Sequence, residues 1–353
     1  MVTIKDIAIK ANVSTATVSY VLNGTGTVSE KTRKRILQII EDLDYKPNQV
    51  AKSLKLRKTK TIGVIVEDIT VFNAPGIIDG INEYAEKLGF SILLTNLRLF
   101  KRVGNNFSVN IEQCREVAKQ KIDELLSNHV DGIIYVGVHP REVSEIIGEV
   151  NKPFVCTYCY STDNTHYSIN YDDEQAAYDA TNYLISFGHK KIALISGLID
   201  SQPAHARYSG FYSALKQNNL PFHPSFIKTG DWEFKSGYQL TKELLETSEE
   251  VPTAIVAMND LMAGGALEAC REIGFKVPED ISIIGIDNQE CSQYFIPPLS
   301  TMGLPLREMG HHSMETIINI LDKKDSDHNV MDKLKCHLIE RKSVAAPSNV
   351  KAK

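Results

Sequence analysis

Several residues of this sequence have side chains that can bind hydroxyl groups or stack on rings. Asp287 follows the apolar run 283–286, and Asn259 follows the apolar run 256–258. A carboxylate can accept two hydroxyl groups at once, and an amide both donates and accepts hydrogen bonds. Trp232 is the only tryptophan, and its flat face suits stacking on a sugar ring. These groups favour a site that binds a hydroxyl-rich small molecule.

The alternatives for these residues are structural, because Asp260 and Asp287 could cap helices and Trp232 could belong to a core. The sequence has no Gly-x-Gly-x-x-Gly after a strand, no phosphate-binding loop and no nucleophile clustered with a base. Ten scattered histidines make no metal pattern, and the pair Cys156 and Cys159 lacks a second Cys or His pair nearby. We therefore expect no enzymatic activity, no metal and no cofactor.

The elements that must position these residues alternate between apolar strands and amphipathic helices. We expect strands at 61–66, 91–95, 132–136, 154–157, 192–196, 254–257 and 281–286. We expect helices at 74–88, 111–128, 141–150, 173–187, 205–217, 234–245 and 260–273. Continuous Val/Ile-rich strands between helices indicate parallel sheets covered on both faces, here in two lobes. Ligands of such sheets bind beyond the carboxyl ends of the strands, so the site should lie in the cleft between lobes.

The first 45 residues follow a different pattern, that of three short helices. Apolar residues at helical spacing predict a first helix, with Ile4, Ile7, Ala8 and Ala11 on one face. Ser14 should cap a second helix that buries Val18, Val21 and Leu22. Its outer face would carry Thr15, Ala16, Ser19, Tyr20 and Asn23. Two short helices joined by such a turn predict a helix-turn-helix, whose second helix fits the major groove of DNA.

A third helix and a short basic segment follow this motif. Ser29 should cap the third helix, which runs to about Leu43. Pro47 suits the start of another helix, but the segment 47–55 has only about two turns and is marginal as a free helix. A short basic helix of this kind favours folding coupled to binding.

Charge is distributed unevenly along the chain. Its net charge of -5 alone would argue against a nucleic-acid partner, but residues 1–60 carry 12 Lys and Arg against five Asp and Glu. The remaining residues carry 27 against 39. A basic head on an acidic body indicates a DNA-binding module joined to another function. Without an apolar leader after Met1 or a membrane-length apolar run, we expect a cytoplasmic protein.

Several motifs stand in order along nearly the whole chain. The N-terminal ones are TIKDIA at 3–8, VSTATVS at 13–19, VLNG at 21–24 and YKPN at 45–48. The later ones are GH at 188–189, PTAI at 252–255, NDLMA at 259–263, VPEDIS at 277–282, GIDN at 285–288 and PPLST at 297–301. Together these motifs resemble those of the lactose/galactose-repressor (LacI–GalR) family of transcriptional regulators.

The resemblance implies an α/β protein with an N-terminal all-α helix-turn-helix headpiece at 1–46 and a hinge helix and linker at 47–58. Two doubly wound parallel-sheet lobes of periplasmic-binding-protein type would follow at 59–343. Of these, the first lobe would hold about 59–160 and 292–321, and the second about 161–291 and 322–343. The tail 344–353 is rich in Ala, Pro, Ser and Lys and should be disordered. It lacks leucine heptads, so a homodimer is the expected assembly.

On the DNA side, the resemblance implies three groups of contacts. Bases would be read by Thr15, Ala16 and Tyr20. Phosphates would lie near Thr3, Ser14, Thr17, Asn23, Ser29, Lys52 and Lys55. Leu54 would wedge into the minor groove at the central step of the operator. Tyr20 departs from the arginine that is frequent at its position, so the half-site it recognises is open, and it could instead pack on the third helix.

On the effector side, the resemblance places Arg207 with Trp232, Asn259 and Asp287. Tyr158 stands where the lactose-binding member has a sugar-binding aspartate, which puts a simple galactoside in doubt. Phe72 and Asn73 occupy the first-lobe side of the cleft.

The segment 97–108 is longer than usual for the family. It is either a solvated surface loop or a functional loop that lies at the cleft edge or contacts a partner.

These features predict a homodimeric repressor whose DNA affinity is set by a small effector, most simply a saccharide. A purine or a phosphorylated carrier protein as co-regulator is an alternative within the same family. Rival classes are a sugar-binding protein of the periplasmic kind and a nucleotide-dependent enzyme. The basic head opposes the first, and the missing motifs oppose the second.

Overall fold

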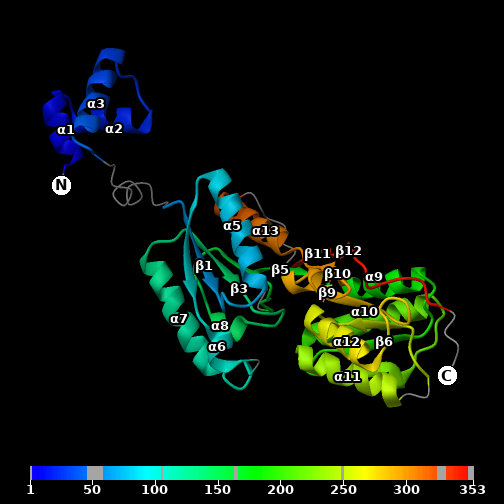
Figure 1. Ribbon diagram of the computed structural model, residues 1–353. Helices are drawn as coiled ribbons and strands as arrows, with labels where there is room; N and C mark the ends of the chain where they lie inside the picture. Colours follow the sequence, from blue (N-terminus) through cyan, green and yellow to red (C-terminus); the bar gives the residue numbers. More distant parts are fainter. Residues whose placement is uncertain are drawn as a thin grey trace. The chain divides into compact units, whose positions relative to one another are not determined.

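The computed structural model describes residues 2–45, 59–104, 106–162, 166–247, 250–323 and 331–348 (Figure 1). The chain divides into two compact units, Met1–Thr59 and Lys60–Lys353. The expected hinge helix, with Lys52, Leu54 and Lys55, lies outside the described residues. No helix of the described part is long and apolar enough to cross a membrane.

The first unit, here called the headpiece, contains the three expected helices, α1 (Ile4–Ala11), α2 (Thr15–Asn23) and α3 (Glu30–Asp42). A hydroxyl side chain begins each of them. Thr3 makes a capping box with Asp6, while Ser14 and Ser29 each accept a hydrogen bond from the backbone N–H three residues later. These bonds satisfy N–H groups that a helix start leaves without partners. The sequence signals for capping are therefore confirmed.

Seven buried side chains form the core of the headpiece, namely Ile7, Ala8, Ala11, Val18, Val21, Ile36 and Ile39. They come from all three helices at helical spacing, so each helix turns one apolar stripe inward. The opposite face of α2 is left exposed to solvent.

The second unit contains two six-stranded sheets. The first sheet has the order β11-β5-β4-β3-β1-β2 and is parallel throughout. Its strands are β1 (Thr61–Val66), β2 (Ser91–Asn96), β3 (Gly132–Val136), β4 (Phe154–Thr157), β5 (Tyr167–Tyr171) and β11 (Met331–Leu334). Helices α5 (Asn73–Leu88) and α13 (Leu306–Leu321) lie on one side of it and α7 (Ile111–Ser127) on the other (Figure 1). We call this sheet with its helices the first lobe.

The second sheet has the order β12-β10-β9-β8-β6-β7, with only β12 antiparallel. Its strands are β6 (Ile192–Ser196), β7 (Ile227–Thr229), β8 (Ala254–Ala257), β9 (Ser282–Asp287), β10 (Ser300–Gly303) and β12 (His337–Ile339). Its helices are α9 (Asp173–Ser186), α10 (Gln202–Gln217), α11 (Phe234–Thr247) and α12 (Asp260–Ile273), with short 3-10 turns η1 (Pro224–Phe226) and η2 (Glu290–Gln293). This sheet with its helices is the second lobe.

Two glycines allow α5 and α13 to pack backbone to backbone. A Cβ on Gly80 would collide with the carbonyl oxygen of Arg307, and a Cβ on Gly310 with that of Ile77. Since no side chain separates the helices at these points, they cover the first sheet as a closely packed pair.

The lobe boundaries expected from the sequence are wrong in three places. β5 pairs with β4, so the first lobe extends to Tyr171 rather than ending near 160. β10 pairs with β9, so the return to the first lobe begins after Gly303 and not near 292. β11 pairs with β5 and belongs to the first lobe, whereas only β12 belongs to the second. Short strands at crossings carry too little local pattern to show which sheet they join.

The segment 97–108 is not a solvated loop. Its helix α6 (Leu99–Val103) and the residues around it bury Leu97, Leu99, Val103 and Phe107 in the core beside α7. The basic side chains Arg98, Lys101 and Arg102 remain exposed. This insert is therefore held by its apolar residues, and its charges face solvent.

Two further expectations are corrected. The helix expected over 141–150 is only α8 (Ser144–Ile147), because Arg141 is used in a buried ion pair and Gly148 has a positive φ of 67° that ends the helix. The part of the tail at 344–348 is ordered against the second lobe: the Ala345 carbonyl accepts hydrogen bonds from His189 and Ser282.

Candidate functional site

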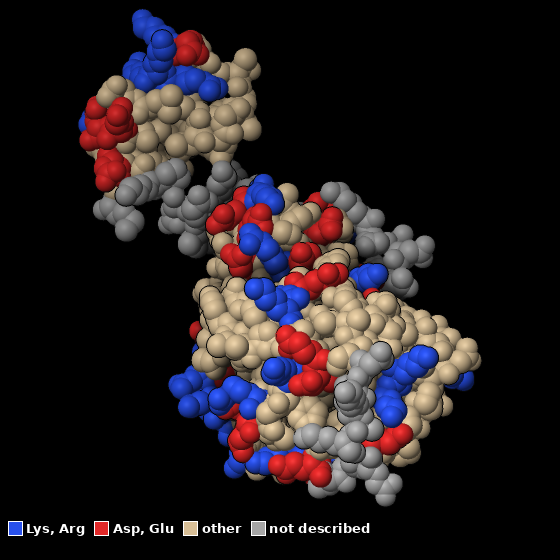
Figure 2. All heavy atoms as spheres, turned by 45° about the vertical axis from the view of Figure 1, so that its right-hand side comes forward, with Lys and Arg blue, Asp and Glu red and all other residues tan. Residues whose placement is uncertain are grey.

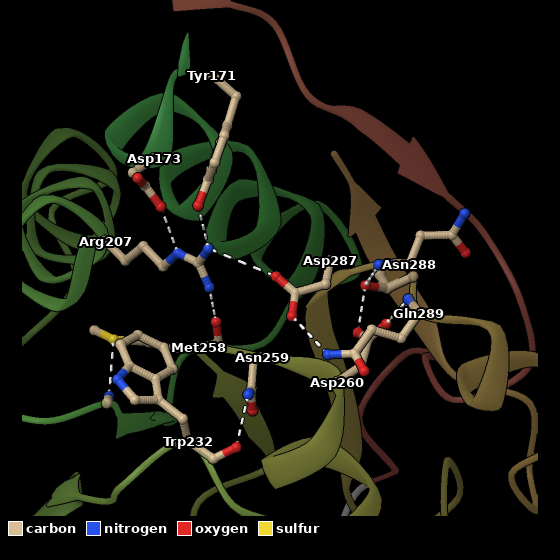
Figure 3. A network of polar contacts seen from close by, with 12 residues as sticks. Tyr171, Asp173, Arg207, Trp232, Met258, Asn259, Asp260, Asp287, Asn288 and Gln289 are labelled. Atoms are coloured by element: carbon tan, nitrogen blue, oxygen red, sulfur yellow. Dashed lines mark hydrogen bonds and ion pairs between the residues drawn. The ribbon is translucent and has the colours of Figure 1, made fainter. Parts of the chain in front are cut away.

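The ends of strands in both lobes bring polar residues together (Figure 3). Asp287 is the last residue of β9, and Asn259 lies between β8 and α12. Tyr171 is the last residue of β5 in the first lobe, and Asp173 begins α9 in the second. Arg207 comes from the second turn of α10 and lies between them. We call these residues with Trp232 the Arg207 network.

Arg207 is the centre of this network and is only 3% exposed. Its Nε donates to Asp173 Oδ1 at 2.6 Å, and its Nη2 donates to the Tyr171 hydroxyl at 2.9 Å. Its Nη1 donates to the carbonyl of Met258, and Asp287 Oδ1 lies 3.6 Å from Nη2. A buried guanidinium is stable here because two carboxylates compensate its charge.

Asp287 links Arg207 to a second acid. Its Oδ2 accepts from the side chain of Gln289 at 2.9 Å, and the backbone N–H of Gln289 donates to Asp260 Oδ2 at 2.8 Å. Asp260 Oδ1 accepts from the Thr301 hydroxyl at 2.5 Å. The two carboxylates are therefore held by hydrogen bonds around one turn of chain.

Trp232 is positioned by Asn259 and by Gly197, which has no side chain. Asn259 donates to the Trp232 carbonyl at 2.8 Å and caps α12 through Met262 N–H at 2.9 Å. The indole lies against Gly197, where a Cβ would collide with the ring. Its ring also lies 5.5 Å from the Arg207 guanidinium, a cation–π distance.

The backbone is unusual at the same place. Tyr158, Trp232, Asp287 and Asn288 all have positive φ, at 61°, 75°, 122° and 55°. Non-glycine residues adopt this region at a cost of about 1–3 kcal/mol each, and such residues cluster at binding sites. The strain supports a functional role for this edge of the sheets.

Burial controls the protonation of the acids. It raises the pKa of Asp260 to about 8, with the Asp287 charge adding to the effect. It raises the pKa of Asp287 to about 6, against the opposing charge of Arg207. In the unfolded chain both groups would lose their protons near pH 4. The folded protein therefore holds protons that the unfolded chain releases, and its stability should fall as pH rises from about 4 to about 8.

Replacing Asp260 with asparagine should flatten this pH dependence. The amide keeps two hydrogen bonds, since its oxygen can accept from Gln289 N–H and its nitrogen can donate to the Thr301 hydroxyl. Melting temperature measured between about pH 5 and about pH 8 should fall less steeply in Asp260→Asn than in the wild type. The exposed Glu290→Gln is the control. An unchanged slope in Asp260→Asn would contradict the assignment.

The first-lobe residues predicted for the cleft are placed differently from one another. Tyr158 is buried and stacks on Tyr171, with 5.4 Å between ring centres. Asn73 begins α5 and donates to the Gly137 carbonyl at 3.0 Å, while Phe72 is 38% exposed. Among the described residues, no hydrogen bond links Phe72 or Asn73 to the Arg207 network.

Tyr171 and Asp173 are members of the Arg207 network that were not predicted from the sequence. Tyr171 ends a strand that was not recognised, although the stretch Tyr167–Tyr171 alternates in side-chain type and precedes the helix cap Asp172. A strand followed by a capped helix is a signal that could have placed both residues at a strand end.

In the headpiece, the residues predicted to read bases are exposed on one face of α2. Thr15, Ala16 and Tyr20 are all open to solvent, as a recognition helix requires. Those predicted near phosphates have structural partners too: Ser14 also contacts the Thr17 hydroxyl at 2.9 Å, and Asn23 donates to the Ser19 carbonyl at 2.9 Å. The start of a helix is in general a favourable place for phosphate oxygens, because its first backbone N–H groups have no partners within the helix.

Charges of each sign are partly grouped on the face of the headpiece seen in Figure 2. Figure 2 shows Lys and Arg side chains gathered at one end of the headpiece and Asp and Glu gathered on another part of the same view. On the second unit, by contrast, positive and negative side chains are interspersed (Figure 2). A local concentration of positive charge suits a polyanionic partner for the headpiece.

Two family models match the chain. Residues 3–48 match the model of bacterial regulatory proteins of the lacI family. Residues 181–344 match the model of periplasmic binding protein-like domains.

Relatives and solved structures cover nearly the whole chain. The HTH-type transcriptional repressor PurR of Pasteurella multocida is 34% identical over 98% of this chain and 99% of its own. Catabolite control protein A of Priestia megaterium is 35% identical over 94% and 96%. The Lac repressor dimer bound to operator and the anti-inducer ONPF has a TM-score of 0.78, with 30% identity over 98% and 99%. The transcriptional regulator CelR in complex with cellobiose has a TM-score of 0.65, with 25% identity over 97% and 100%.

Proposed function

The chain belongs to the LacI family of DNA-binding transcriptional repressors, and from this premise we propose that it is a homodimeric repressor of carbohydrate-utilisation genes, controlled by a saccharide. Two headpieces would bind the halves of a pseudo-palindromic operator. This activity would take place in the cytoplasm, where the DNA is. The observation that carries the effector part is the Arg207 network, with Asp287 and Trp232 at the carboxyl ends of the second sheet.

A saccharide suits this network for two reasons. Asp287 is an acceptor for hydroxyl groups, and the indole of Trp232 offers a face for a pyranose ring. The carboxylates Asp173 and Asp287 already neutralise Arg207, so the site favours a neutral polar ligand over an anion. The CelR structure, which holds cellobiose, is a neighbour in fold that supports the same ligand class.

The network also gives the ligand a way to act on both lobes. Tyr171 belongs to the first lobe and accepts a hydrogen bond from Arg207 of the second. A ligand that breaks or reinforces this bond favours one arrangement of the lobes. It acts only through its different affinity for the two arrangements, typically a coupling of about 1–3 kcal/mol.

Exposed apolar side chains on the second lobe support dimerisation. Tyr294 is 70% exposed and Ile296 is 87% exposed, in the turn between η2 and β10. Large apolar side chains left open to water mark interaction surfaces when they lie together. We assign this turn to the contact with a second copy of the chain.

A purine or a phosphorylated carrier protein remains the alternative co-regulator.

A ligand panel on the purified protein tests the proposal. Mono- and disaccharides, sugar phosphates and nucleobases should be compared by thermal shift. A ligand at about 100 times its Kd adds roughly 2.7 kcal/mol to the free energy of unfolding. Trp232 is the only tryptophan in the chain, so tryptophan emission reports on this residue alone. A saccharide that binds beside the indole should change that emission. The same saccharide should change affinity for the operator.

The outcomes separate the ligand classes. A response to nucleobases alone would overturn the saccharide proposal and favour the purine alternative. Stabilisation without any change in Trp232 emission would show that the ligand binds away from the indole.

A further inference from the structure

Tyr20 and Gly26 make a contact in the headpiece that the proposed function does not by itself explain. Tyr20 lies in the last turns of α2, and Gly26 lies in the loop that leads to α3. A Cβ built on Gly26 would lie 2.9 Å from Tyr20 Cγ, 3.1 Å from Cδ2 and 3.2 Å from Cδ1. The aromatic ring therefore lies directly against the bare Cα of Gly26.

The atoms in contact are those at the base of the ring. Cγ is attached directly to the tyrosine Cβ, so it moves away only when χ1 changes to another rotamer. Tyr20 is nevertheless 48% exposed, so the remainder of the side chain is open to solvent. Gly26 thus restricts the direction of the ring without covering it.

We propose that Gly26 is a positioning residue for Tyr20, and that this contact determines which operator base pair the tyrosine hydroxyl recognises. The inference rests on the proposed role of Tyr20 in base reading. A tyrosine offers a single hydroxyl to the groove, so its selectivity depends on where that hydroxyl points. A ring already held in its bound direction also loses less rotamer entropy when DNA binds.

A neighbouring glycine provides a matched control. Gly24 has φ of 65° and Gly26 has φ of 75°, so alanine is strained at both positions. A Cβ on Gly24 would meet no atom within 4 Å, whereas a Cβ on Gly26 would meet the Tyr20 ring. Comparing the two alanine variants separates backbone strain from the displaced ring.

The experiment uses four full-length variants beside the wild type: Gly26→Ala, Gly24→Ala, Tyr20→Ala and the double variant Tyr20→Ala/Gly26→Ala. Each protein selects its preferred duplex from a randomised double-stranded DNA pool. Affinities for the duplex that the wild type selects, and for an unrelated duplex, are then measured at one salt concentration.

We expect Gly26→Ala to lower affinity for the selected duplex about tenfold and to change the preferred base at one position in each half-site. Affinity for the unrelated duplex should stay the same. Gly24→Ala should keep the wild-type base preference. In the Tyr20→Ala background, Gly26→Ala should have no further effect on preference, because the residue it acts through is gone.

Different contrary results would contradict different parts of this proposal. Equal losses in Gly26→Ala and Gly24→Ala, or an effect of Gly26→Ala that persists without Tyr20, would overturn the positioning role. An unchanged preference in Tyr20→Ala would overturn it as well, because Tyr20 would not read bases. If the wild type selected no sequence at all, the proposed DNA-reading function itself would fail.

A spectroscopic measurement tests the contact without DNA. In full-length protein labelled at glycine, the Gly26 α protons should show a ring-current shift that Tyr20→Ala removes. The Gly24 α protons should be unaffected. A Gly26 signal that does not change in Tyr20→Ala would contradict the contact.

Discussion

Replacing Arg141 with methionine should lower the free energy of unfolding by about 3–5 kcal/mol, because it leaves a buried carboxylate without its counter-charge. Glu67 follows β1 and is fully buried, and Arg141 follows β3. The guanidinium holds both carboxylate oxygens, with Nη1–Oε2 at 2.8 Å and Nη2–Oε1 at 2.5 Å. This is a bidentate ion pair between the ends of two neighbouring strands.

Three further contacts complete this pair. The Tyr135 hydroxyl donates to Glu67 at 2.7 Å and the Val138 N–H at 2.8 Å, while the Phe107 ring lies 3.8 Å from the guanidinium. Burial alone would raise the pKa of Glu67, but the Arg141 charge together with the hydrogen bonds from Arg141, Tyr135 and Val138 outweighs burial, and the pKa is lowered. The pair therefore contributes stability above the unfolded pKa of Glu67, which is lost as pH falls through its folded value.

Urea unfolding of the wild type and Arg141→Met measures this effect. The control is Arg115→Met, since Arg115 pairs with Glu112 at an exposed site and its loss should cost about 1 kcal/mol or less. Glu67→Gln combined with Arg141→Met should recover part of the loss, because no unpaired charge remains. Equal effects of Arg141→Met and Arg115→Met would contradict the assignment.

Replacing Asp287 with alanine should weaken effector binding by about 10- to 100-fold, with little change in affinity for operator DNA. Hydrogen bonds to a charged group contribute about 1.5–3 kcal/mol when the partner would otherwise be lost. The fold should tolerate the change, because Arg207 keeps Asp173, Tyr171 and the Met258 carbonyl as partners. The substitution should therefore weaken ligand binding without destabilising the lobes.

Titration of Trp232 emission with the saccharide found in the ligand panel measures this loss. Operator affinity without ligand is measured beside it. The neighbouring Glu290→Ala is the control, since that side chain is exposed on the next turn of chain. An unchanged ligand affinity in Asp287→Ala would remove Asp287 from the site.

Local pattern was enough to predict many elements. The strands β1, β3, β4, β6 and β8 begin and end where their Val- and Ile-rich runs do. Ser14 and Ser29 cap α2 and α3 as expected, because a cap is made by residues only three apart. The same locality placed Asn259 and Asp287 at strand ends, since each directly follows an apolar run.

The sequence by itself therefore determined the headpiece, the alternation of strands and helices, and the family. The tertiary structure alone decided which sheet β5, β10 and β11 join, and so brought Tyr171 to Arg207, which lies 36 positions later. It also paired Glu67 with Arg141, which are 74 positions apart, and seated Phe107 of the insert on that pair. The physical reason is that such contacts depend on how distant segments pack, whereas periodicity and capping report only on neighbours along the chain.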